Sequence, residues 1–95
     1  MINVEYVMLT PSADASADFI APNANGVLEM QHVTLDRNTS STKFTCPTGN
    51  FLSVTAANKT PSHIVVQVQI IVDGVVVAEN SSTNPSQNAI ASGNF

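Results

Sequence analysis

The amino-acid sequence predicts a small all-β protein, an antiparallel sandwich of seven to eight short strands in one domain spanning residues 1–95. Apolar and polar residues alternate over short segments, and clusters of Pro, Gly, Asn and Ser interrupt them roughly every ten residues. No segment shows the 3.6-residue apolar period of an amphipathic helix. The strongest single signal is Asp73-Gly74, which separates two runs rich in valine and isoleucine. A two-residue hairpin turn requires positive φ, which Gly adopts freely and Asp tolerates.

The segment His63–Asn80 is therefore expected to form a hairpin around this turn, and we expect it to be the central pair of its sheet. One face of the pair would be almost entirely branched aliphatic, as in a sheet that is buried on one side. The predicted register places these residues opposite each other: Val72 and Val75, Ile70 and Val77, Val68 and Glu79, and Ile71 and Val76.

Six further segments alternate strongly enough to be predicted as strands. The second of them is rich in alanine, which favours helix, but it is short and its apolar residues alternate. Phe44 and Cys46 are expected to face inward, and Pro47–Asn50 is expected to be a β-turn between two hairpin strands. The predicted strands are Ile2–Leu9, Ala13–Ala21, Val27–Leu35, Thr42–Cys46, Phe51–Ala57 and Asn88–Ser92.

Charge is unusually scarce in this chain. Only 11% of the residues are charged and the net charge is −4, whereas about 25% is ordinary for a soluble domain. The three basic residues, Arg37, Lys43 and Lys59, do not cluster, so binding to nucleic acid or to an anionic membrane surface is not expected. Natural sheets protect their edges with charges, especially Lys. The scarcity of charge therefore favours edges that are covered by a protein partner, including a further copy of the chain.

Neither a signal peptide nor a membrane span is visible in these residues. The first ten residues lack a basic segment followed by an apolar one, and no apolar run approaches the ~20 residues of a membrane span. If Met1 is the native start, the expected location is a virion or the cytoplasm. If a leader was removed, the expected location is extracytoplasmic.

The second half of the chain also has a distinctive order of strands and turns. It reads G-x-F-L-x-V-x-A-x-N in Gly49–Asn58, an alternating hairpin in Ile64–Asn80, and A-x-A-S-G in Ala89–Gly93. This order resembles the immunoglobulin-like extracytoplasmic domain of small mycobacterial membrane proteins and related small domains of Bacteroidota. The resemblance implies an immunoglobulin-like sandwich. It does not extend to a role in lipid export, because the sequence shows no anchor segment and Val33–Asp36 stands where a Pro-Trp pair is expected.

Residues suited to catalysis or to metal binding are few. A zinc site needs three or four ligands, whereas the chain offers His32, His63 and Cys46. Cys46 is more simply explained as a buried apolar cysteine than as a nucleophile. Asp14 and Asp18 are expected to lie on a solvated strand face rather than to form a pair for acid–base work. We therefore predict no catalytic residue, metal or cofactor.

The remaining hypotheses are non-enzymatic. The first is a structural or assembly protein, such as a small decoration or auxiliary protein of a phage capsid. The second is an extracytoplasmic or host-targeted protein-binding module, and the third is a carrier of a lipid or small molecule. For the first, contacts are expected in two polar loops and near both termini. Phe95 would then either insert into a partner, tuck under the sandwich or fray. The predicted contact residues are Met1, Ile2, Asn38, Ser40, Asn84, Pro85, Ile90 and Phe95.

Overall fold

The structure is a computed structural model that describes residues 1–9, 14–36, 40–58, 65–83 and 87–95. The described residues form eight β-strands and no helix, so this part of the chain contains no helical segment that could span a membrane. The strands are β1 (Ile2–Leu9), β2 (Asp14–Pro22), β3 (Leu28–Asp36), β4 (Ser40–Cys46), β5 (Phe51–Asn58), β6 (Val66–Val72), β7 (Val75–Ser82) and β8 (Ala89–Asn94).

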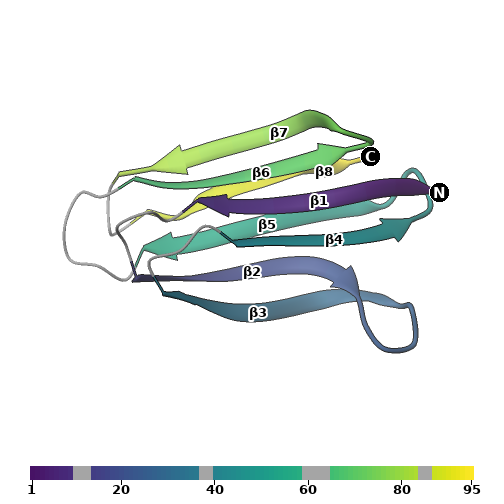
Figure 1. Ribbon diagram of the computed structural model, residues 1–95, viewed down its shortest axis with the longest axis horizontal. Coiled ribbons are helices and arrows are strands. Elements are labelled where there is room, and N and C mark those ends of the chain that lie inside the picture. The colour runs from purple at the N-terminus through teal and green to yellow at the C-terminus, as the bar shows by residue number, and fades with distance from the viewer. Residues whose placement is uncertain (10–13, 37–39, 59–64, 84–86) are drawn as a thin grey trace.

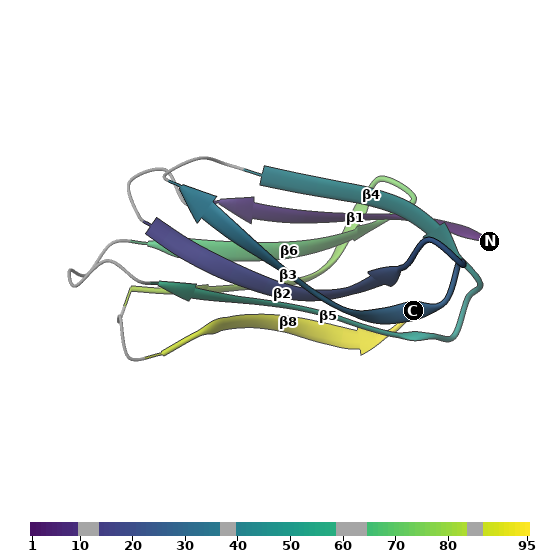
Figure 2. The same cartoon turned by 90° about the horizontal axis from the view of Figure 1, so that it is seen from below.

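These strands build two antiparallel sheets that pack face to face (Figures 1 and 2). Sheet A has the order β4-β1-β6-β7, and sheet B has the order β3-β2-β5-β8. The predicted all-β sandwich is thus confirmed. In an immunoglobulin constant domain the first and second strands share a sheet, whereas here β1 pairs with β4 and β6. Sandwiches of this architecture do not always share one topology.

The core lies between the sheets and takes alternate residues from each strand. On β1, Val4, Tyr6 and Met8 are almost completely buried, and the residues between them face outward. The Tyr6 ring contacts the rings of Phe19 and Phe44, with centroids 5.6 and 5.3 Å away, and its hydroxyl donates a hydrogen bond to the carbonyl of Ile20. Tyr6 therefore joins the two sheets through both packing and a polar contact. Other fully buried core residues are Leu52, Val54, Ala56, Val66, Val68, Ile70 and Ala89.

The predicted hairpin forms, but its position in the sheet was predicted wrongly. The central pair of sheet A is β1 with β6, and β7 is an edge strand. β1 takes the central place because every second residue of it is apolar and buried, while most side chains of β7 remain exposed. In Figure 1, β7 runs along one border of the molecule.

The predicted hairpin register holds only near the turn. Val72 pairs with Val75 and Ile71 with Val76, but the register then shifts by one residue at a β-bulge, with Val77 as the extra residue. Beyond it, Ile70 lies opposite Ala78 and Val68 opposite Asn80, in place of Val77 and Glu79. A bulge adds one residue to one strand and increases its twist.

The hairpin turn is attached to β1 by two hydrogen bonds. Asp73 has φ of 49° and Gly74 has φ of 83°, as a type I′ turn requires. The backbone amide of Asn3 donates to Asp73 Oδ1 at 2.9 Å, and the amide of Asp73 donates to the carbonyl of Asn3 at 2.8 Å. Asp73 thus both allows the turn and connects it to the start of β1.

The turn at Pro47–Asn50 does not close a hairpin, contrary to the prediction. It carries the chain from β4 in sheet A to β5 in sheet B, with Gly49 at φ of 86°. A local turn signal describes the change of direction but does not show which strands pair. The inward orientation of Cys46 and Phe44 was predicted correctly, since Cys46 is buried and Phe44 packs against the core.

Candidate interaction surface

The predicted contact residues differ in how far they are exposed. Met1 and Ile90 are exposed apolar residues, and Ser40 is half-buried at the start of β4. Ile2, in contrast, is only 7% exposed and belongs to the core. Its place in the inward series of β1 makes it unavailable as an anchor, which corrects the expectation for this residue. Three predicted residues lie outside the described part of the chain: Asn38, Asn84 and Pro85.

Phe95 occupies a defined place on its own chain. Its amide donates to the carbonyl of Asn50 at 3.1 Å, and its carbonyl accepts a hydrogen bond from the amide of Gly49. The ring packs against the core and lies over Gly93, where a Cβ atom would come within 2.6 Å of Phe95 Cζ. Of the three alternatives left open by the sequence, the structure shows the tucked arrangement.

A run of exposed apolar residues begins β7, in a hairpin that was expected at the centre of its sheet with Val75 and Val77 on its buried face. Val75, Val76 and Val77 are 63, 46 and 40% exposed, and they follow one another at the start of β7. They were missed because the hairpin was expected at the centre of its sheet. The signal that could have placed β7 at an edge is Glu79-Asn80-Ser81-Ser82, a polar end that a strand flanked on both sides rarely carries.

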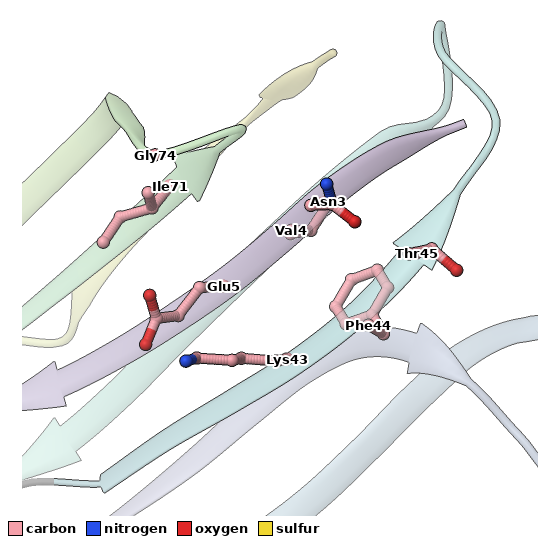
Figure 3. Close-up of a pocket in the computed structure, with 8 residues that line it drawn as sticks. All are labelled: Asn3, Val4, Glu5, Lys43, Phe44, Thr45, Ile71 and Gly74. Carbon is pink, nitrogen blue, oxygen red and sulfur yellow. The ribbon is translucent and has the colours of Figure 1, made fainter.

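A hollow of about 530 Å³ lies on the outer face of sheet A, between β4 and the hairpin turn (Figure 3). Its charged border consists of Glu5 and Lys43, which lie opposite each other on β1 and β4. Ile71 lies opposite Glu5 on the other side, and Gly74, which has no side chain, leaves space beside the turn. Figure 3 shows the Lys43 ammonium group and the Glu5 carboxylate on the same side of the hollow. Its remaining lining residues are Asn3, Val4, Phe44 and Thr45.

A second hollow, of about 420 Å³, lies between β4 and the hairpin of β2 and β3. Its lining is mainly apolar and includes Met1, Leu28, Phe44 and Cys46. The Cys46 side chain is buried, as predicted, and burial raises the pKa of its thiol. A raised thiol pKa disfavours the thiolate, which is the nucleophilic form. The structure thus agrees with a buried apolar cysteine at the border of a mainly apolar hollow.

One ionisable pair lies on the outer face of sheet B. His32 Nδ1 is 2.7 Å from Asp18 Oδ1, and the two residues are opposite each other on β3 and β2. Both side chains are about half exposed, so the contact is a surface cross-strand pair of small energy. In the described part of the chain, no three His, Cys, Asp or Glu side chains converge as metal ligands would. His63 lies outside the described residues.

Taken together, these surfaces include the two outer strands of sheet A, three exposed valines at the start of one of them, and the charged residues Glu5 and Lys43 beside the other. Such surfaces suit contact with another polypeptide, because an open strand edge offers main-chain donors and acceptors in a row. Comparison with models of protein families found no match, and comparison with curated proteins found none either.

Proposed function

We propose that this protein is a non-enzymatic assembly module, a structural subunit or auxiliary protein that associates with neighbouring protein subunits in a larger particle. A decoration protein of a phage capsid is one example of this class. The observation that supports the proposal most strongly is the edge strand β7, whose first three residues are exposed valines. An exposed apolar edge of this kind is prone to pair with another chain unless it is protected.

The scarcity of charge supports the same proposal. The described edge strands of sheet A carry one charged residue each, Lys43 on β4 and Glu79 on β7. Edges that remain free in solution are usually blunted by several charges, by Pro, by a β-bulge or by a covering loop. The bulge of β7 lies at Val77, so the part of the strand beyond it keeps a regular edge. Interfaces between proteins, in contrast, are depleted of charge in their centres.

The proposal predicts that the protein associates with itself as its concentration rises. The mass in solution, measured by light scattering over a concentration series, should exceed that of one chain at high concentration and return to it on dilution. Exposed apolar area that is buried on association drives this change. A single-chain mass at every concentration would contradict self-assembly and would favour either a monomeric module that binds a different protein or a decoration protein that assembles only on its particle.

A further inference from the structure

We propose that copies of this protein join head to tail, with β7 of one copy pairing antiparallel with β4 of the next copy. The inference rests on the proposed function and names its partner, a second copy of this chain. β4 and β7 are the two outer strands of sheet A. Each copy therefore presents one edge of each kind, and their union would continue sheet A from copy to copy.

The strand directions permit this union without rotating one copy relative to the next. β1 is antiparallel to both β4 and β6, and β6 is antiparallel to β7. β7 consequently runs in the direction opposite to β4. Placing two copies side by side in the same orientation sets β7 against β4 as an antiparallel pair, so the extended sheet has antiparallel neighbours throughout.

The two edges also match in polarity along their length. β7 begins with three exposed valines and ends in Asn80 and two serines, whereas β4 begins with two serines and reaches Phe44 near its end. Antiparallel pairing therefore sets the polar end of β7 against the serines of β4 and the start of β7 against the end of β4 that contains Phe44. Such cross-strand matches are the main source of stability in sheet pairing.

One register also satisfies the charges. Glu79 and Lys43 both point to the outer face of sheet A, because Glu79 pairs with Gln69 and Lys43 pairs with the outward Glu5. Setting Glu79 opposite Lys43 would place Lys43 between two carboxylates, those of Glu79 and Glu5. The pairs across the joint would be Val77 with Thr45, Ala78 with Phe44, Glu79 with Lys43, Asn80 with Thr42, and Ser81 with Ser41.

This register includes a step along the strands. Within one copy, Glu79 pairs with Gln69, Gln69 with Val7 and Val7 with Ser41, so Glu79 and Ser41 lie at the same height across the sheet. Pairing Glu79 with Lys43 of the next copy therefore displaces that copy along the strands by two residues, or about 7 Å. A two-residue step keeps each side chain on its face, whereas a one-residue step would invert every face. A repeated head-to-tail step that does not close into a ring gives an open chain of subunits.

Symmetric pairing of identical edges fits less well. In an antiparallel pair of two β7 strands, the valines of one copy would face the Asn-Ser end of the other, and two β4 strands would oppose Phe44 to serines in the same way. The bulge at Val77 lies near the turn, so it leaves the part of β7 that contains Glu79 regular. Polarity and charge therefore both favour the head-to-tail arrangement.

The experiment is a charge exchange measured by light scattering, with Glu79→Lys and Lys43→Glu prepared as separate proteins. Each variant alone would place like charges at the joint and should raise the concentration for half-assembly about ten-fold. An equimolar mixture should assemble at a lower concentration than either variant alone, because each joint between the two variants then brings opposite charges together, whereas Glu5 beside position 43 keeps recovery below the wild-type level. In the mixture, β7 of the Lys43→Glu variant meets β4 of the Glu79→Lys variant with the wild-type residues at the joint. β7 of the Glu79→Lys variant meets β4 of the Lys43→Glu variant with the two charges exchanged.

Glu29→Lys on β3 is the matched control. It makes the same change of charge on an edge of the other sheet, and this variant should assemble as the wild type does.

The outcomes separate this inference from the proposed function. Assembly that stops at a dimer, or that neither single variant weakens, would overturn the head-to-tail pairing and leave the assembly function standing. A mixture that fails to recover while both variants keep the wild-type circular dichroism spectrum and melting temperature would also overturn it. A wild-type protein that stays a single chain at all concentrations would overturn the head-to-tail pairing and would leave only assembly with a different protein.

Discussion

Replacing Tyr6 with Ala should lower the free energy of unfolding by about 3–5 kcal/mol, because it removes a large aromatic side chain from the centre of the core. Tyr6 is fully buried and contacts the rings of Phe19 and Phe44. The substitution would leave a cavity at the centre of the sandwich and remove the hydrogen bond to Ile20. Denaturant unfolding of the dilute protein measures the change, and a loss below about 1 kcal/mol would contradict the central role of this residue.

Tyr6→Phe is the control, because it keeps the ring and removes only the hydroxyl, at a cost of about 1–3 kcal/mol. Burial raises the pKa of the Tyr6 hydroxyl well above its ordinary value of 10.0, and an interaction with the Ser53 backbone opposes this only in part. Above that ordinary value the unfolded chain ionises while the folded chain does not, so wild-type stability falls as the pH rises. The stability advantage of the wild type over Tyr6→Phe should therefore narrow above about pH 10. Because the chain has one tyrosine, tyrosinate absorbance follows this group directly.

The second large effect is expected at the C-terminal end of β8. Gly93→Ala should lower stability by about 1–3 kcal/mol, because the new Cβ would lie 2.6 Å from Phe95 Cζ and displace the ring from its packing. Gly93 is not among the glycines with positive φ, so its backbone conformation alone would accept alanine. The cost should therefore largely vanish in a Phe95→Ala background, as a double-mutant cycle measures.

Gly26→Ala provides the matched control for this cycle. Gly26 has φ of 77°, and a Cβ there would meet no atom within 4 Å, so alanine would be strained by the backbone alone. Its cost should be the same with and without Phe95. Equal costs for Gly93→Ala in the two backgrounds would show that Phe95 does not pack there.

The eight strands could be predicted because each carries a local signal. Alternation, Pro and Gly punctuation and the Asp73-Gly74 turn act within a few residues, and they located every strand to within a few residues of its observed bounds. Pairing between strands depends instead on contacts that are distant in the sequence. β1 pairs with β4 and β6, but no local sequence feature of these strands indicates which strands they pair with. The hairpin was therefore wrongly placed at the centre of its sheet.

The candidate interaction surface was harder to predict for the same reason. An exposed valine and a core valine are identical in a sequence, and Val75, Val76 and Val77 became recognisable as surface only once β7 was seen at an edge. Phe95 illustrates the converse case. Its tucked position depends on space above Gly93 and on hydrogen bonds to residues 49 and 50, none of which a terminal position reveals.

The most direct test of assembly through the edges of sheet A is amide hydrogen exchange measured at low and at high protein concentration. Amide groups of β7 and β4 that point away from their neighbours in the sheet should become protected as concentration rises, because pairing supplies them with carbonyl acceptors. The edge strand β3 of sheet B should exchange at the same rate throughout. Exchange in β7 and β4 that is independent of concentration, or protection that appears on β3 instead, would contradict assembly through these edges.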